Sequence, residues 1–413
     1  MKALQFERNV PKYAAAMVAG SLRPGGGAKV GPLRLRDIDV PELPGPDWVH
    51  VKPRLAGICG SDLSTIDGSS SRYFDPIVSF PFTMGHEIVA DLVDPEQGIT
   101  DADGTHRVVI EPVLGCVTRN ISPVCSYCAA GDLGNCVNIA FGALEPGLQS
   151  GFCCDTGGGW STMMVAHRSQ LHPVPEAMSD EAAVMVEPTA CALHGVFAAE
   201  VQPGEAVVVL GSGTLGLAAL AALRRHARPG SIVVVAKHAV QRDFATELFG
   251  DAPHCSLVDP DEIKRGVRRT TGAMALGDGD ITRLAGGADV VIDCVGSEAS
   301  LADALAVVKP RGRIAMLGMP GEVKVDLTGL WQREIRLFGT YAYGTERGAD
   351  GGERRTFDLA FDLVQADDLG RLVTATYPLA RFEDAVTHAA QAGRRGAVKV
   401  AFDLRPEKER NRL

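Results

Sequence analysis

The spacing of apolar and polar positions changes along the chain and divides it into two kinds of region. Up to about Asp180, short β-branched runs such as Val49–Pro53 and Arg107–Pro112 are interrupted often by Gly and Pro. Short runs with frequent turn residues predict a β-rich, barrel-like domain. We expect helical periodicity only from about Asp180 onward.

A second pattern begins near Glu205 and continues to Gly339. Helix-forming segments separate four short apolar runs: Val207–Leu210, Ile232–Val235, Val290–Ile292 and Ile314–Leu317. Apolar strands that alternate with helices predict a parallel, doubly wound α/β sheet. Beyond it, Phe357–Ala366 is expected to be helical, and Ala397–Phe402 is expected to be a strand that returns to the first domain.

A glycine-rich turn follows the first of these apolar runs directly. Its glycines have Gly-x-Gly-x-x-Gly spacing and precede the helix-forming segment Leu217–Arg225. The first glycine allows a tight turn, the second lets the backbone approach a pyrophosphate, and the third lets the helix pack closely on the sheet. The helix N-terminus then offers free N–H groups to phosphate. The residues expected to bind a dinucleotide are Gly211, Gly213, Thr214, Leu215 and Gly216.

The end of the next strand indicates which dinucleotide is preferred. An acidic side chain there would hydrogen-bond the ribose 2′-hydroxyl of NAD. The chain instead has Lys237 and His238, with Arg242 nearby. Cationic donors suit the 2′-phosphate of NADP through charge-assisted hydrogen bonds, so we expect NADP(H) in preference to NAD(H).

Composition and charge exclude several classes of function. The chain has 413 residues, more than one core usually accommodates, with 46% hydrophobic residues and a formal net charge of −10. No basic run is present, so nucleic-acid binding is not expected. No apolar stretch is long enough to span a membrane, and residues 1–20 do not resemble a secretory signal. We therefore expect a cytoplasmic protein, in which the 10 cysteines stay reduced.

Two groups of potential metal ligands occur in the first domain. Cys59, His86 and Glu87, with Glu187 further along, offer a thiolate, an imidazole and carboxylates, which are the ligand types that zinc prefers. A separate group of cysteines predicts a closed structural zinc site: Cys116, Cys125, Cys128 and Cys136. The adjacent Cys153 and Cys154 are competing candidates for the fourth position in that site.

In chain order, these motifs resemble the zinc-containing medium-chain dehydrogenases, the alcohol dehydrogenase family, over nearly the whole sequence. Trp331–Gly339 is similar to the family's segment near the end of the nucleotide domain, and Gly396–Val400 to its closing strand. Glu187-Pro188 resembles the polyol, threonine and butanediol dehydrogenase branch. The resemblance implies a Rossmann doubly wound parallel sheet at 190–340 and a β-rich, GroES-like catalytic domain made of 1–189 and 341–413.

The resemblance also implies roles for individual residues. Cys59 and His86 would hold a catalytic zinc, with Glu87, Glu187 or both completing its shell. Ser61 would be the first hydroxyl of a proton relay, and Asp62 would orient the local structure.

The chain departs from the family pattern in three places. Ser122 stands where the family's first structural cysteine is expected, and Cys116 is displaced upstream. Ser64 replaces a histidine that relays protons in many members. The insertion Ser69–Phe74 is long and is a candidate lining of the substrate pocket.

The expected function is zinc-dependent hydride transfer between NADP(H) or NAD(H) and a small molecule, either a secondary alcohol or polyol or the corresponding ketone. The catalytic residues would be Cys59, Ser61, His86 and Glu87. Two alternatives are a zinc-independent enone or quinone reductase of the same fold, and a nucleotide- and zinc-binding protein without turnover. The resemblance also suggests a homo-oligomer, either a dimer or a tetramer.

Overall fold

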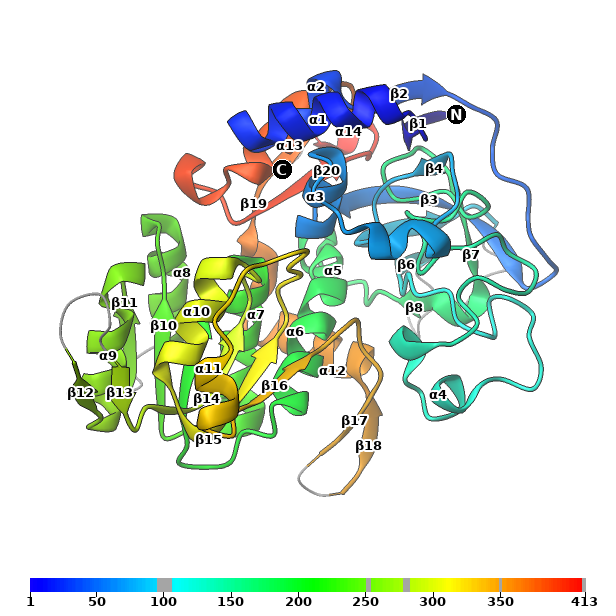
Figure 1. Ribbon diagram of the computed structural model, residues 1–413. Coiled ribbons are helices and arrows are strands. Elements are labelled where there is room, and N and C mark those ends of the chain that lie inside the picture. Colours follow the sequence, from blue (N-terminus) through cyan, green and yellow to red (C-terminus); the bar gives the residue numbers. More distant parts are fainter. Residues whose placement is uncertain (95–105, 250–253, 278–282, 349–350, 411–413) are drawn as a thin grey trace. The chain divides into compact units, whose positions relative to one another are not determined.

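The protein folds into two compact units, which Figure 1 shows as a ribbon. A computed structural model describes residues 1–94, 106–249, 254–277, 283–348 and 351–410. One unit contains Met1–Glu187 and Tyr343–Leu413, and the other contains Pro188–Ala342. The first unit is therefore built from two separate stretches of chain, and the second from a single one.

The second unit contains a parallel sheet with the order β11-β10-β9-β14-β15-β16 in its described residues. Its strands are β9 (Ala206–Leu210), β10 (Ser231–Val235), β11 (Cys255–Val258), β14 (Ala288–Asp293), β15 (Val308–Met316) and β16 (Arg336–Gly339). A short hairpin, β12 (Met274–Leu276) and β13 (Arg283–Ala285), precedes β14. The parallel sheet confirms the prediction from the four apolar runs, each of which lies within or overlaps one of these strands.

The strand order reverses between β9 and β14, where successive connections turn in opposite directions. This is the 3-2-1-4-5-6 order of doubly wound dinucleotide-binding folds, whose ligands bind at the carboxyl ends of the strands beside the reversal. The glycine-rich turn follows β9 and lies at that point. The helices are α7 (Thr214–Ala222), α8 (Ala239–Phe249), α9 (Ile263–Thr271), α10 (Glu298–Val307) and α11 (Thr328–Gln332), and α6 (Val186–Ala198) leads into the unit.

The first unit is β-rich, as predicted. Its larger sheet has the order β19-β20-β3-β5-β6-β8, with β7 paired to β3, and a smaller sheet has the order β2-β1-β4. The strands are β1 (Lys2–Phe6), β2 (Leu33–Asp37), β3 (Trp48–Gly57), β4 (Phe82–Thr83), β5 (Ile88–Leu92), β6 (Arg107–Ile110), β7 (Met164–His167), β8 (Leu171–Pro173), β19 (Val373–Tyr377) and β20 (Lys399–Asp403), and the hairpin β17 (Thr345–Arg347) and β18 (Glu353–Arg355). The C-terminal strand β20 pairs with β3, so the predicted return of the chain to the first domain is confirmed.

The first unit also contains α-helices. They are α1 (Val10–Leu22), α2 (Gly27–Val30), α3 (Gly60–Ile66), α4 (Ser126–Ala129), α5 (Asp180–Val184), α12 (Thr356–Ala366), α13 (Phe382–Ala390) and α14 (Glu407–Arg410). The core beneath them includes Phe82, Trp160 and Phe402. Trp160 meets Phe402 edge-on, with ring centroids 4.9 Å apart.

The helix α1 corrects the expectation that helices begin only near Asp180. Asn9 caps α1 by accepting a hydrogen bond from the Lys12 N–H at 3.1 Å, and an alanine-rich centre favours the helix. Periodicity did not reveal it because its outward positions, such as Met17 and Val18, are apolar as well.

Among the described residues, the structure contains no helix both long and apolar enough to cross a bilayer.

Close packing of α7 on β9 requires glycine at position 216. A Cβ atom there would lie 1.9 Å from the carbonyl oxygen of Gly211, whereas one at Gly213 would meet nothing within 4 Å. We therefore predict that Gly216→Ala destabilises the nucleotide unit by about 1–3 kcal/mol through steric overlap. Gly213→Ala is the matched control and should leave the thermal unfolding midpoint unchanged. Equal midpoints for both variants would show that the turn relaxes without cost.

Candidate active site and metal centres

Two neighbouring strands bring the first group of predicted ligands together. β3 ends at Gly57, and its antiparallel neighbour β5 begins at Ile88. The end of one antiparallel strand lies beside the start of the next. Cys59, which follows β3, therefore meets His86 and Glu87, which precede β5. Ligand atoms of these three residues all lie within 4.8 Å of one another.

Gly85 fixes the path of the chain into this group. Its φ is +97°, and a Cβ atom there would lie 2.3 Å from Cδ1 of Trp160. The indole N–H of Trp160 in turn donates to the Gly57 carbonyl at 3.1 Å. The buried indole therefore packs against the backbone on both sides of the site, and only glycine fits between it and His86.

Asp62, in the first turn of α3, contacts both Cys59 and His86. One carboxylate oxygen accepts the Cys59 N–H at 2.9 Å, and the other lies 3.5 Å from His86 Nδ1. Burial alone would lower the pKa of His86, but Asp62 and then Cys59 raise that pKa well above its ordinary value. A carboxylate held against one ring nitrogen orients the imidazole and leaves the other nitrogen for a metal.

A buried lysine joins the group, and the sequence analysis missed it. Lys399 begins β20, which pairs antiparallel with β3, so it reaches the same end of the sheet. Its ammonium forms an ion pair with Glu87 and donates to the Ile58 carbonyl at 3.3 Å. Burial alone would lower the pKa of Lys399, but Glu87 and then Cys59 raise it. The feature of the sequence that could have revealed this residue is a single lysine within the otherwise apolar segment Ala397–Phe402.

Two further predicted residues lie near this group without joining its close set. Glu187, at the start of α6, is buried, and its charge acts on Lys399. Its carboxylate does not belong to the group of Cys59, His86 and Glu87, whose ligand atoms lie within 4.8 Å of one another. Ser61, in the first turn of α3, is half-buried, and its carbonyl accepts a hydrogen bond from the Thr65 hydroxyl at 2.9 Å.

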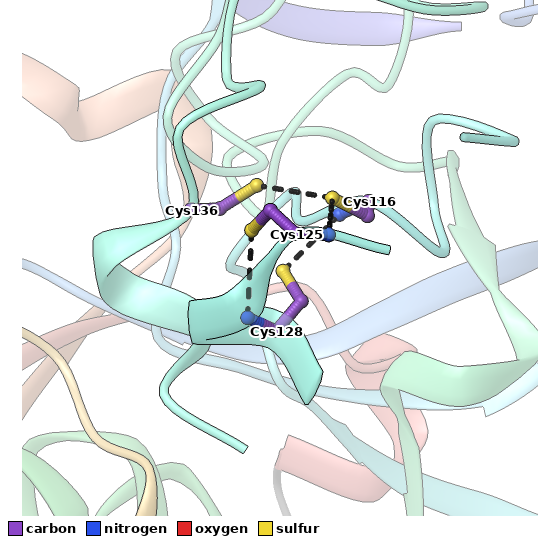
Figure 2. Close-up of side chains that lie close together, drawn as sticks. All are labelled: Cys116, Cys125, Cys128 and Cys136. Carbon is purple, nitrogen blue, oxygen red and sulfur yellow. Dashed lines mark hydrogen bonds between the residues drawn. The ribbon is translucent and has the colours of Figure 1, made fainter. Parts of the chain in front are cut away.

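The four predicted structural cysteines converge at a second centre, as Figure 2 shows. One sulfur atom from each of Cys116, Cys125, Cys128 and Cys136 lies within 4.8 Å of the others. Cys153, which competed for the fourth position, is buried elsewhere, and its thiol donates to the Glu145 carbonyl at 3.5 Å. The displaced Cys116 is therefore the cysteine that completes the group.

The geometry of these cysteines fits a tetrahedral metal. The sulfur atoms of Cys116 and Cys136 are 3.6 Å apart. Zinc–sulfur bonds of about 2.3 Å in a tetrahedron place sulfurs about 3.8 Å apart. Backbone N–H groups also point at the sulfurs, including that of Cys125 toward Cys116 at 3.3 Å and that of Cys128 toward Cys125 at 3.5 Å.

The same N–H groups shape the acidity of the thiols. Burial opposes ionisation of Cys125, yet the backbone N–H groups of Cys128 and Val137 lower its pKa to about 6. Burial raises the pKa of Cys136. One thiol of the group is thus poised to ionise near neutral pH, and a divalent cation would favour ionisation of the others.

The predicted cofactor residues lie around the end of β9 and β10. Gly211 has a φ of +84°, which favours glycine, and α7 begins at Thr214. Lys237, just beyond β10, is exposed. Arg242 is already engaged, because its guanidinium donates to the Ala236 carbonyl at 3.0 Å and to Asp259 at 3.3 Å. His238 and Leu215 complete the predicted set and also lie after β10 and β9, respectively.

Comparisons with known proteins identify the family of both parts of the chain. Residues 45–176 match the alcohol dehydrogenase GroES-like domain, and residues 214–366 match the zinc-binding dehydrogenase family. A sorbitol dehydrogenase of Halalkalibacterium halodurans is 27% identical over 363 residues, covering 86% of this chain and 92% of that protein.

Solved structures show the same fold. The 2R,3R-butanediol dehydrogenase of Bacillus subtilis has a TM-score of 0.68 at 21% identity, with 98% of this chain and 99% of that chain covered. A putative zinc-binding dehydrogenase of Sinorhizobium meliloti 1021, bound to NADP, has a TM-score of 0.68 at 24% identity, with 97% and 98% covered.

A doubly wound nucleotide unit, together with a thiolate, an imidazole and a carboxylate in close contact, defines a metal-dependent dehydrogenase. The chain belongs to the zinc-dependent medium-chain dehydrogenase/reductase family, with a GroES-like domain and a Rossmann-type zinc-binding dehydrogenase domain. It is therefore an oxidoreductase of the alcohol dehydrogenase type that uses a nicotinamide dinucleotide.

The buried pair of Lys399 and Glu87 generates a prediction on stability. Lys399→Met leaves the carboxylate of Glu87 buried without a counter-charge, which should cost about 3–5 kcal/mol in unfolding free energy. The double variant Glu87→Gln/Lys399→Met should recover most of that loss. Chemical denaturation measures both, and Lys52→Met, an exposed lysine of β3, is the control. A loss no larger than that of Lys52→Met would contradict the role of the pair.

Proposed function

We propose that the chain catalyses reversible hydride transfer between a secondary alcohol or polyol and a nicotinamide dinucleotide, at a zinc held by Cys59, His86 and a glutamate. The observation that carries the proposal is the convergence of Cys59, His86 and Glu87 within 4.8 Å, in a chain of the zinc-dependent family. When bound, zinc supplies Lewis-acid polarisation of the substrate oxygen.

The ion pair of Lys399 with Glu87 bears on which glutamate completes the metal shell. Glu87 is already neutralised by a buried ammonium. Glu187 is buried as well, and its charge acts on Lys399 more weakly than that of Glu87 does. We therefore assign Glu187 as the third protein ligand, with Glu87 held in place by Lys399.

Ser61 is the proposed acceptor of the hydroxyl proton. It follows Cys59 by two residues, in the first turn of α3, which places it beside the metal ligand. A positioned hydroxyl can take the proton as the alcohol is oxidised and pass it on. The segment Ser69–Phe74 remains the proposed lining of the substrate pocket, and η1 (Arg72–Ile77), a 3₁₀ helix, begins in it.

Relatives support a polyol or secondary alcohol as the substrate class. Matched proteins are named sorbitol dehydrogenase, L-idonate 5-dehydrogenase and 2R,3R-butanediol dehydrogenase. Each of these names refers to a substrate with more than one oxygen substituent. We propose the same class for this chain.

The proposal extends to the organisation of the molecule. Residues 1–189 with 341–413 would form the catalytic domain, and 190–340 the dinucleotide-binding domain. β16 forms one edge of the described parallel sheet, where strands of two copies can pair into a dimer or half of a tetramer. The free state of all ten cysteines suits a reducing compartment such as the cytoplasm.

Metal content gives the first test. Wild-type protein should hold two zincs per chain, and Cys59→Ala should hold one and lose at least about 100-fold in turnover, because it lacks polarisation of the substrate oxygen. Mass spectrometry and oxidation of sorbitol and 2,3-butanediol measure the two effects. Cys255→Ala, on β11 and outside both cysteine groups, is the control.

If zinc content and turnover do not depend on Cys59, zinc-independent enone or quinone reduction replaces the proposal. Bound zinc without turnover of any alcohol would indicate a non-catalytic protein.

Cofactor preference gives the second test. We propose NADP(H) over NAD(H), supported by the exposed Lys237 after β10 and the absence of a carboxylate at positions 236–238. Lys237→Asp should lower the ratio of kcat/KM for NADP+ to that for NAD+ by about 10–100-fold, because it replaces a charge-assisted hydrogen bond with repulsion. Lys324→Asp, also exposed in this unit, should not change the ratio. An unchanged ratio in Lys237→Asp would reject Lys237 as the determinant.

A further inference from the structure

A fully buried arginine lies beside the four-cysteine centre. Arg119 follows Cys116 by three residues, and its side chain has no exposed surface. Its guanidinium donates hydrogen bonds to five backbone carbonyl groups, of Leu114, Phe141, Leu144, Glu145 and Gly147, at distances between 2.6 and 3.4 Å. It therefore fastens the segment that carries Cys116 to the loop that follows Cys136.

The charge of Arg119 has no direct carboxylate partner. In the part of the chain that the structure describes, no acidic side chain lies within ion-pair distance of its guanidinium. The carboxylate of Asp155 accepts the Glu145 N–H instead, at 2.7 Å, and acts on Arg119 only through space. Carbonyl dipoles satisfy the donors of a buried cation but do not neutralise its charge, and such a charge is costly without an anion nearby.

The cysteine centre offers that anion. A divalent zinc bound by four thiolates carries a net charge of −2. Among the thiols, Cys153, which lies outside the centre, has the largest electrostatic effect on the guanidinium, and Cys136 and Cys116 of the centre also act on it. The side-chain N–H of Asn138 donates to Cys116 at 3.2 Å and is a neutral donor to the same sulfur.

We propose that Arg119 is a positioning and charge-balancing residue of the four-cysteine metal centre, which retains its metal partly because this buried cation offsets the charge of the thiolates. The inference rests on the proposed structural zinc. It also accounts for the displaced Cys116, because Arg119 lies within the residues between Cys116 and Cys125 that replace the shorter family spacing. The turn there is closed by the Ile121 N–H, which donates to the Cys116 carbonyl at 2.9 Å.

The test compares zinc release from the holoenzyme to a chromogenic chelator in Arg119→Lys and Arg119→Gln. The release phase that persists in Cys59→Ala belongs to the cysteine centre. Arg119→Gln removes the charge and should release this zinc about 10–100-fold faster than wild type. Arg119→Lys keeps the charge but loses the planar fork, and it should release zinc much more slowly than Arg119→Gln. Arg107→Met, a partly buried arginine of β6 that pairs with Asp180, should not change the release.

Equal release rates in the Lys and Gln variants would overturn the charge-balancing role, and wild-type rates in both would overturn any role of Arg119. Comparing the Lys and Gln variants answers the question even if a larger apolar substitution fails to fold. If wild-type protein holds no zinc at the cysteine centre, the proposed structural site itself is wrong. Two zincs in wild type with unaltered release in the variants would reject this inference alone.

Discussion

The buried ion pair between Lys399 and Glu87 is the interaction on which the catalytic end of the first unit depends. A lysine and a glutamate without access to water are each costly, and together they are tolerable only in close contact. Their contact joins three strands: β3, which leads to Cys59, β5, which follows His86, and β20, which begins with the lysine. Gly57 leaves the space for it, since a Cβ atom there would overlap the Glu87 carboxylate. The positions of the candidate metal ligands therefore follow from how the sheet neutralises one buried charge.

Local patterns in the sequence predicted much of the fold and most of the site. The apolar runs identified the parallel sheet because a strand covered on both faces has no polar positions. The Gly211–Gly216 turn was recognisable because its glycines are required by contacts within a few residues. At Gly216, for example, a Cβ atom would lie 1.9 Å from the Gly211 carbonyl oxygen. The four cysteines were found because thiols in one short segment have few other uses in a reducing environment.

What the sequence did not predict depends on long-range contacts or on unusual surfaces. Lys399 meets Ile58 across 341 residues, and no local pattern reports such a contact. Arg119 gave no signal, since a single arginine in a loop is ordinarily exposed. The helix α1 was missed because its solvent side is nearly as apolar as its buried side. The contact of Glu87 with a buried ammonium, which bears on our proposal for the third ligand, also lay beyond the sequence.

The discontinuity of the first unit has a consequence for biosynthesis. The nucleotide unit is one continuous stretch, Pro188–Ala342, and can fold as soon as that stretch has left the ribosome. The first unit cannot, because β3 lacks its neighbour β20 and Glu87 lacks its counter-ion until Lys399 has been synthesised. During translation the strand that leads to Cys59 thus lacks one sheet neighbour, and Glu87 stays in solvent because burying it without Lys399 would be costly. The chain reverses the usual order in which the N-terminal domain matures first, and its proposed metal site is among the last parts to form.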